Sequence, residues 1–343
     1  MEYGDPNADA EILRSAIKGK TKDEDKIIKL ITNRSNAQRQ NIKEAYNSLY
    51  NSDLIKDLQK ELSGHFGDVV MALFYLPVDY DCFQLRKAVK GLGTDEDALI
   101  EILATRPPEV IEQIKERYSE MYPGRTLLKD IEDDTSGNFK SILTALIEAK
   151  RPSNSNPDLA ECEKCAKLLQ DATEQKKKDV EIFSKIFTEK SQAEFICIAQ
   201  LYFKLTKKTI LQVVEKEFSG DSKEALIGII YAMLSPSEYF AKKVYKSIKG
   251  LGTDNNTLIR ILITRNEKDM PQIKQFYKQI YKKDMIEGIK DDTSGSYRKI
   301  LVELATHRRQ TPPWEYCRRL WRCGIRCHEL LHNPYRYDHS PRW

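Results

Sequence analysis

The sequence of 343 residues predicts an all-α protein made of four related units of about 70 residues each. Apolar residues recur at helical spacing almost throughout; after Thr94, for example, Leu99, Ile100, Ile102 and Leu103 form one broad apolar face. The strict alternation of apolar and polar residues that is typical of half-buried strands is not found in the sequence. In addition, a glycine-containing motif and a distant acidic motif recur together, which indicates internal duplication.

The clearest repetition joins two copies of one motif. The segment "KGLGTDEDALIEILATR" begins at position 90, and "KGLGTDNNTLIRILITR" begins at position 249. Each is followed by "DDTSG", so that Asp134 lies 40 residues after Thr94 and Asp292 lies 39 residues after Thr253. A single motif of this kind would suggest only a tight connection between helices, but two copies with matching distant acids indicate a shared role.

Two weaker copies complete the set of four. The segment "KGKTKDEDKIIKLITNR" from position 18 keeps the helical pattern, and Glu61 lies 39 residues after Lys22, where the stronger copies have aspartate. The segment "QKKKDVEIFSKIFTEK" from position 175 keeps the apolar spacing but has no glycine in its loop. We therefore predict a short N-terminal arm at 1–7, repeats at 8–77, 78–150, 158–235 and 236–307, a turn-rich linker at 151–157, and a basic tail at 308–343.

Residues with well-known positional preferences predict where helices begin. Thr94 and Thr253 directly precede periodic segments, so we expect them to be N-caps. Pro107, Pro108 and Pro271 fit the first turn of a following helix. Each repeat is therefore expected to contain about five short helices.

The net charge of +4 conceals an uneven distribution. Residues 308–343 carry +5 and residues 1–307 carry −1, so electrostatics alone would not bring the repeats to nucleic acid or anionic lipid. No apolar run approaches the roughly 18 residues of a membrane-spanning helix, and the N-terminus does not resemble a secretory signal. Together with seven cysteines, an odd number, these features favour a cytoplasmic protein with reduced thiols.

Two short motifs suggest chemistry that the surrounding sequence does not support. The "GKT" at positions 19–21 looks like the end of a phosphate-binding loop, but Arg14 stands where that loop needs glycine. Cys162 and Cys165 form a lone "CEKC", which we interpret as an incidental surface feature because a second cysteine pair is missing. His65 and His307 lie in no catalytic motif, so we expect that the protein is not an enzyme.

The tail, residues 308–343, is rich in Arg, Trp, Cys and His. Its possible zinc ligands, Cys317, Cys323, Cys327, His328 and His332, follow no common zinc-module spacing. We interpret the tail as disordered or as not native to the gene. The alternative function is calcium-independent binding of RNA or anionic lipid through its Arg, Trp and Tyr side chains.

A loop with two glycines can direct several backbone carbonyls to one point, and Ca²⁺ accepts about 6–8 oxygen ligands, carbonyls included. The predicted ligands are Val89, Gly91, Gly93 and Asp134 in one repeat, and Ile248, Gly250, Gly252 and Asp292 in the other. A single carboxylate leaves the ion short of charge and of ligands, so water or a phosphate group can fill the open positions. Such a site could connect the protein to a phospholipid.

The paired loops, the helix ending in "TR" and the distant "DTSG" closely resemble the annexin family over residues 8–307. The resemblance implies a curved disc of four five-helix repeats with calcium loops on its convex face. It implies calcium-dependent binding to acidic phospholipid, such as phosphatidylserine, and a role in peripheral membrane organisation or trafficking. It further implies no specific nucleic-acid partner, and a cytoplasmic protein, monomeric in solution, that is recruited when calcium rises and is able to assemble on membranes.

The resemblance is incomplete in repeats one and three. In repeat one, Thr21 replaces the second glycine and Lys22 replaces the threonine, so we expect no tight calcium site there. The residues of this repeat with a weak or lipid-contacting role are predicted to be Gly19, Lys20, Lys22 and Glu61. Repeat three offers Glu217 but no glycine loop, so we expect no calcium there either.

Two ionisable residues occupy matching positions inside the predicted helices. Glu101 and Arg260 each follow the loop threonine by seven residues. In annexin-like packing both would point into a central hydrophilic channel. The alternative is that they lie on solvated helix faces.

Overall fold

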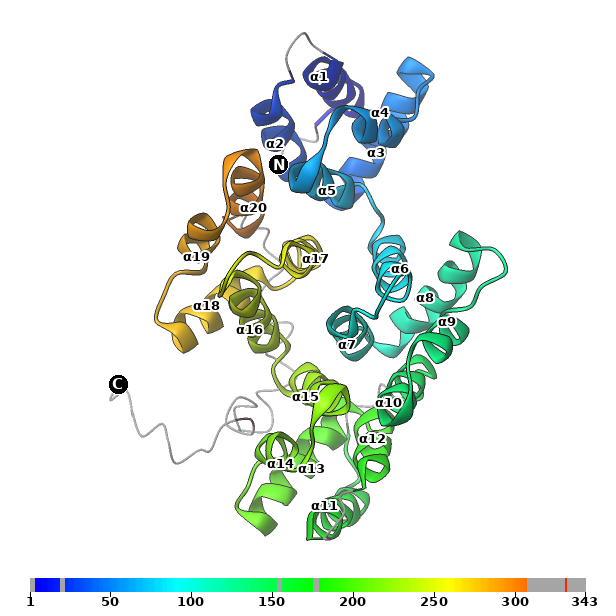
Figure 1. The fold of residues 1–343 in the computed structure, drawn as a ribbon, viewed down its shortest axis with the longest axis vertical. Coiled ribbons are helices and arrows are strands. Elements are labelled where there is room, and N and C mark those ends of the chain that lie inside the picture. Colours follow the sequence, from blue (N-terminus) through cyan, green and yellow to red (C-terminus); the bar gives the residue numbers. More distant parts are fainter. Residues whose placement is uncertain (1–3, 19–21, 153–155, 175–178, 307–330, 332–343) are drawn as a thin grey trace. The chain divides into compact units, whose positions relative to one another are not determined.

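The computed structural model describes residues 4–18, 22–152, 156–174, 179–306 and Leu331 (Figure 1). These residues form 20 α-helices and no strand, which confirms the all-α prediction and gives five helices to each of four repeats. None of the described helices has the length and apolar character needed to cross a bilayer.

The helices follow one another in four sets of five. Repeat one contains α1 (Pro6–Lys18), α2 (Glu24–Thr32), α3 (Asn36–Tyr50), α4 (Leu54–Glu61) and α5 (Gly64–Leu73). Repeat two contains α6 (Pro77–Ala88), α7 (Glu96–Thr105), α8 (Pro108–Met121), α9 (Leu127–Asp134) and α10 (Gly137–Ile147). Repeat three contains α11 (Leu159–Glu174), α12 (Val180–Glu189), α13 (Gln192–Thr206), α14 (Ile210–Glu217) and α15 (Gly220–Leu234). Repeat four contains α16 (Pro236–Ile248), α17 (Asn255–Arg265), α18 (Met270–Tyr281), α19 (Met285–Asp292) and α20 (Gly295–Thr306).

The first of two compact units combines the beginning and the end of the repeat region, residues 1–80 and 240–312. Within it α2 packs on α20, and α5 packs on both α17 and α20 (Figure 1). The apolar faces of these helices are fully buried, as Ile31 on α2, Val69 on α5 and Leu301 on α20 illustrate. Burial of each such side chain contributes about 1.5–3 kcal/mol, so repeats one and four stabilise each other.

The second unit is formed, within the described residues, mainly by residues 81–239 and holds most of repeats two and three. Here α7 packs on α15, and α10 packs on both α12 and α15. The approach of α15 to α7 is close at Gly228, where an added Cβ would lie 2.5 Å from Cγ2 of Ile100. Glycine at this position is therefore required by packing between two helices.

An ion pair follows the second helix in repeats one and two, buried in repeat two and partly buried in repeat one. In repeat one, Nε of Arg34 donates to Asp9 at 2.6 Å; in repeat two, Nε of Arg106 donates to Asp81 at 2.7 Å. Each pair spans 25 residues and connects the first helix of its repeat to the end of the second. A buried charge left without its partner is costly, so these pairs fix the position of one helix relative to the other.

In repeat four, the equivalent arginine, Arg265, is held by different residues. Phe240 stands 25 residues before Arg265, where the other two repeats have aspartate. The guanidinium of Arg265 lies 4.3 Å from the centre of the Phe240 ring and pairs with Asp269 at 2.6 Å. A cation–π contact and a carboxylate from the following segment thus replace the missing aspartate.

Helix starts agree with the sequence at the prolines and differ at the threonines. Pro107 is the N-cap of α8, and α18 carries Pro271 in its first turn, as predicted. The prediction that Thr94 and Thr253 are N-caps is wrong. Their neighbours Asp95 and Asp254 are the N-caps, because their carboxylates accept from the backbone N–H of the third residue of the helix.

The interpretation of the "CEKC" segment as a surface feature is also wrong. Cys162 and Cys165 lie on the apolar face of α11 and are 1% and 2% exposed. Burial raises the pKa of the Cys162 thiol to about 12 and also raises that of Cys165, so both thiols stay protonated at neutral pH. They are core residues of repeat three.

Candidate functional site

The loops that connect α6 to α7 and α16 to α17 have the same backbone conformation. Gly91 and Gly250 have φ values of +142° and +141°, and Gly93 and Gly252 have values of +87° and +89°. Side chains rarely adopt these angles, although an added Cβ would meet no atom within 4 Å. The glycines are therefore required by the path of the backbone and not by crowding.

A backbone hydrogen bond closes the neck of each loop, from the N–H of the helix N-cap to a carbonyl seven residues earlier. The bonds run from Asp95 to Ala88 (2.9 Å), from Asp254 to Ser247 (2.8 Å) and, in repeat one, from Asp23 to Ala16 (3.0 Å). The neck of repeat one therefore closes in the same way, although this repeat lacks the second glycine. Closure of the neck therefore does not require the second glycine.

The loop threonines bring the distant aspartates to the loops. The hydroxyl of Thr94 donates to Oδ2 of Asp134 at 2.8 Å, and that of Thr253 donates to Oδ2 of Asp292 at 2.5 Å. Among the described residues, nothing donates a hydrogen bond to the second carboxylate oxygen, Oδ1, of either aspartate. Each loop thus has an adjacent carboxylate that is held in place through one oxygen.

The available donors fit a hard cation. Within the described residues, no three His, Cys, Asp or Glu side chains gather closely enough to hold a metal, so a site here must use backbone oxygens. Each loop supplies carbonyls from an exposed glycine segment and one carboxylate, a set of oxygen ligands that suits Ca²⁺. Zinc sites in proteins are mostly built from cysteine and histidine side chains, which these loops do not provide.

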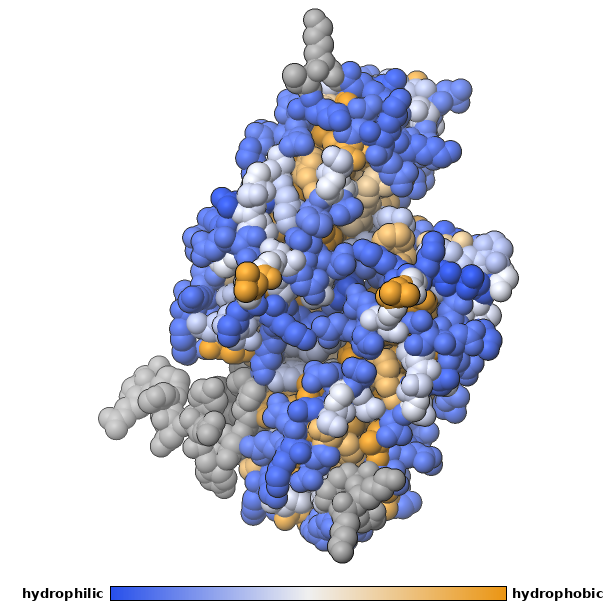
Figure 2. Space-filling view, in the orientation of Figure 1, coloured by the Kyte–Doolittle hydropathy of each residue, from blue (hydrophilic) through white to orange (hydrophobic). Residues whose placement is uncertain are grey.

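Sequence reasoning missed the leucine between the two glycines of each loop. Leu92 and Leu251 are 109% and 110% exposed, more than any other large apolar residue described. The surface drawn in Figure 2 is mostly hydrophilic, and full exposure of a leucine at the same position of two equivalent loops indicates a shared role. The signal was present in both copies of "KGLGTD", where an apolar residue stands in a loop too short to bury it.

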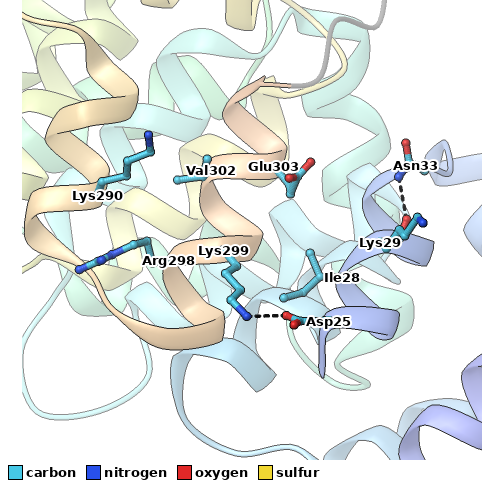
Figure 3. A pocket seen from close by; sticks show the side chains of 9 residues that line it. All are labelled: Asp25, Ile28, Lys29, Asn33, Lys290, Arg298, Lys299, Val302 and Glu303. Atoms are coloured by element: carbon cyan, nitrogen blue, oxygen red, sulfur yellow. Dashed lines mark hydrogen bonds and ion pairs between the residues drawn. The ribbon is translucent and has the colours of Figure 1, made fainter. Parts of the chain in front are cut away.

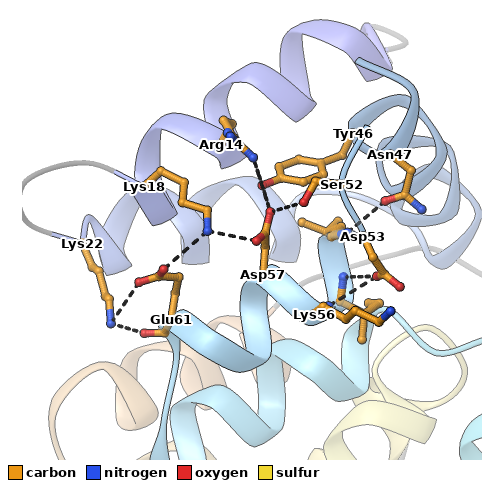
Figure 4. Close-up of polar contacts among 12 residues, drawn as sticks. Arg14, Lys18, Lys22, Tyr46, Asn47, Ser52, Asp53, Lys56, Asp57 and Glu61 are labelled. Carbon is orange, nitrogen blue, oxygen red and sulfur yellow. Dashed lines mark hydrogen bonds and ion pairs between the residues drawn. The ribbon is translucent and has the colours of Figure 1, made fainter. Parts of the chain in front are cut away.

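In repeat one, a lysine occupies the position of the loop threonine. Lys22 donates through Nζ to the main-chain oxygen of Glu61, and the same ammonium lies 3.6 Å from Oε2 of Glu61 (Figure 4). Thr94 and Thr253 likewise contact both the main-chain oxygen and the carboxylate of their acids. Repeat one therefore has a positive charge directly beside its carboxylate.

A second acid, Asp57, lies next to Glu61 in a dense polar network. Its carboxylate accepts from Lys18 at 2.9 Å, from Tyr46 at 2.8 Å and from Ser52 at 2.9 Å, and Arg14 lies 3.3 Å away (Figure 4). These donors, Lys18 foremost, lower the pKa of Asp57 to about 2. Lys18 also lies 3.4 Å from Glu61, so lysines bind both acids of repeat one.

Several predicted residues lie outside the described residues. These are Gly19 and Lys20 in repeat one and the loop at 175–178 in repeat three. Of the tail, 308–343, only Leu331 is described, and it is buried, so the predicted zinc ligands and the tail-based alternative function lie outside as well. Glu217 is described at the end of α14, 3.6 Å from Lys216.

Glu101 and Arg260 are both 0% exposed. They lie within α7 and α17, and Nη2 of Arg260 donates to Thr257 at 3.2 Å. Their burial rules out the alternative that they lie on solvated helix faces. Because they belong to different units, their place in a central channel stays a prediction.

Comparison with known proteins identifies the family. The family model described as "Annexin" matches residues 8–73, 80–146, 164–229 and 239–304, one match for each repeat. The chain belongs to the annexin family. Calcium-dependent phospholipid binding is characteristic of annexins.

Individual annexins match over most of the chain. Human annexin A4 is 43% identical over 297 residues, which cover 86% of this chain and 93% of annexin A4. Human annexin A7 is 40% identical over 297 residues, 86% of this chain and 61% of annexin A7. Among solved structures, annexin III has a TM-score of 0.86 at 33% identity, with 90% of this chain and 95% of that chain covered. A calcium-bound annexin (Sm)1 has a TM-score of 0.79 at 30% identity, with 88% and 90% covered.

Proposed function

We propose that this annexin binds acidic phospholipid membranes through calcium at two loops, those of repeats two and four. The observation that carries the proposal is that both loops combine matching glycine angles, a threonine-held aspartate and a fully exposed leucine. The proposed ligands are those predicted from sequence: Val89, Gly91, Gly93 and Asp134, and Ile248, Gly250, Gly252 and Asp292. When bound, calcium would bridge these oxygens to a lipid phosphate.

Leu92 and Leu251 give each loop a second means of holding a membrane. Each leucine stands at the tip of its loop with its whole side chain in water. Transfer of a leucine side chain from water to an apolar environment is worth about 1.5–3 kcal/mol. We propose that both leucines enter the acyl boundary of the bilayer when the loops dock, so that binding depends on apolar contact as well as on charge.

Repeat one is proposed to hold its loop acid without calcium. The ammonium of Lys22 contacts the carboxylate and the main-chain oxygen of Glu61, so it neutralises the group that a calcium ion would need. An incoming cation would have to displace Lys22 and would be repelled by Lys18. We therefore assign calcium to two repeats and leave a direct lipid contact by Lys20 and Lys22 as the alternative role of this loop.

The remaining expectations follow from this assignment. We propose a binding protein and not an enzyme, located in the cytoplasm, monomeric in solution and recruited to membranes when calcium rises. Glu101 and Arg260, at equivalent positions of α7 and α17, are proposed to line a central channel. Membrane organisation or trafficking is the broader process to which such recruitment belongs.

The test is cosedimentation with phosphatidylserine vesicles over a range of calcium concentrations. We expect Asp134→Ala and Asp292→Ala each to raise the calcium concentration needed for half-maximal binding at least tenfold, and the double variant to abolish binding. The matched control is Glu61→Ala, which removes the equivalent acid of repeat one and should leave calcium dependence unchanged. Binding that survives chelator but is lost on deletion of residues 308–343 would contradict the proposal and favour the tail-based alternative.

A further inference from the structure

A groove of about 570 Å³ lies in unit one, where α2 and α20 face each other (Figure 3). Four cationic side chains line it: Lys29 from α2, Lys290 from α19, and Arg298 and Lys299 from α20. Two acids, Asp25 and Glu303, lie among them. The lining residues therefore have a net charge of +2, of which Lys290 is also paired with Glu287 at 2.9 Å, and the volume suits a polar group the size of a small phosphorylated sugar.

The charges in the groove are only partly compensated by one another. Lys299 pairs with Asp25 across the groove at 2.7 Å, and both side chains are more than half exposed. Within the described residues, the ammonium of Lys29 contacts no acid. Exposed ion pairs contribute little to stability. An anionic ligand can therefore replace Asp25 as the partner of Lys299 at a low cost in free energy.

Arg298 is held in position by the loop that follows α19. Its Nε donates to the main-chain oxygen of Thr293 at 2.5 Å. The remaining guanidinium nitrogens belong to a planar fork that suits phosphate oxygens. Because one nitrogen is anchored, less side-chain freedom is lost when the others bind a ligand.

Two apolar side chains also line the groove. Ile28 and Val302 contribute them, one from each facing helix. Apolar side chains among cationic ones favour a ligand with a carbon skeleton and phosphate substituents over a bare inorganic ion. A headgroup built on a polyol has this character.

The groove begins next to the carboxylate of the repeat-four loop. Thr293, the acceptor for Arg298, directly follows Asp292 in sequence, and Lys290 precedes Asp292 by two residues. When that loop is docked on a membrane, the headgroups of adjacent lipids would therefore lie close to the groove. No proposed calcium ligand lines the groove itself.

We propose that this groove is a calcium-independent site for a polyphosphorylated polyol headgroup. Lys29, Arg298 and Lys299 bind its phosphates, and Ile28 and Val302 contact its ring. The site goes beyond the proposed calcium function, because it uses different residues and needs no ion. On a membrane it would select lipids whose headgroups carry extra phosphates.

The test measures binding of soluble inositol trisphosphate by calorimetry in the presence of chelator. We expect saturable binding to the full chain. The double variant Lys29→Gln with Arg298→Gln, the groove variant, should lose at least tenfold in affinity. The matched control removes the same two charges elsewhere, with Lys204→Gln and Arg117→Gln, and should change affinity less than twofold. Circular dichroism checks the fold of both variants.

Vesicles distinguish a membrane-borne headgroup from a free metabolite. Addition of an inositol polyphosphate lipid to phosphatidylserine vesicles should lower the calcium needed for binding in the native chain and not in the groove variant. If only the soluble compound binds, the ligand is a free polyphosphate. Absence of calorimetric binding, or equal binding by the groove variant, would overturn the proposal. Asp134→Ala with Asp292→Ala should keep the calorimetric binding, so the two proposals can fail separately.

Discussion

At the scale of single residues, equivalent positions of the repeats hold the loop acid with different side chains. A threonine hydroxyl holds the loop acid in repeats two and four, whereas the Lys22 ammonium holds it in repeat one. The hydroxyl positions its acid without neutralising it, but the ammonium does both. A substitution at one position therefore changes the electrostatics of a loop while its neck stays closed.

Asp57 should make repeat one sensitive to acid. Its pKa is about 2 in the folded protein, against 3.8 for an ordinary aspartate, so its ionised form stabilises the fold. This contribution is fully present above about pH 4 and is lost as the pH falls from 4 towards 2. We expect Asp57→Asn to lower the free energy of unfolding by about 2 kcal/mol at pH 7.

Urea unfolding across this pH range measures the effect. The difference between the native chain and Asp57→Asn should shrink towards zero near pH 2. Asp171→Asn, at an exposed position on α11, is the control and should cost less than about 0.5 kcal/mol. A difference that stays constant from pH 7 to pH 2 would show that Asp57 acts through packing and not through its charge.

At the scale of helices, the pairing of α7 with α15 depends on the absence of one side chain. Gly228→Ala would place a Cβ 2.5 Å from Cγ2 of Ile100. Overpacking typically costs about 1–3 kcal/mol, of which alanine recovers up to about 1 kcal/mol through helix propensity. We expect a net loss of about 1–2 kcal/mol, measured as a lower free energy of unfolding.

A double variant separates packing from backbone effects. In an Ile100→Ala background the obstructing methyl group is gone, so Gly228→Ala should become neutral or stabilising. If the substitution costs the same in both backgrounds, the close approach is not the reason for glycine at this position.

Helices and repeats could be predicted from the sequence because their signals are periodic and occur four times. The exact helix starts could not, since Thr94 and Asp95 are both good N-caps and only the contact with Asp134 decides between them. Cys162 and Cys165 were misjudged because positions three apart share a helix face, and the motif alone does not show whether that face is buried. The groove could not be predicted, because residues about 270 positions apart line it.

At the scale of the whole molecule, the compact units do not follow the order of the repeats along the chain. Unit two is formed mainly by one continuous stretch, whereas unit one needs segments from both ends of the repeat region. We expect a fragment of residues 77–248, which keeps α6 and α16 whole, to fold alone with a cooperative thermal transition. Residues 1–76 alone should not, because α2 and α5 would lose the helices of repeat four against which they pack.

Circular dichroism and thermal melting of the separate fragments measure this difference. Addition of residues 236–312, which include α16, to residues 1–76 is the control and should restore helicity to the mixture. Cooperative folding of residues 1–76 on their own would contradict the expectation. So would a fragment 77–248 that shows no cooperative transition.

The hydrogen bonds at the loop necks have a consequence for the speed of signalling. The Asp95–Ala88 and Asp254–Ser247 bonds close both proposed calcium loops in the free chain. Ion capture then requires no folding of the loop, so little conformational entropy is lost on binding and association can approach the rate of diffusion. The duration of membrane attachment would therefore be set by how quickly the ions and the lipid leave. If the loops bind calcium as proposed, the protein would respond to a rise in calcium almost at once, and its rate of release would set how long the response lasts.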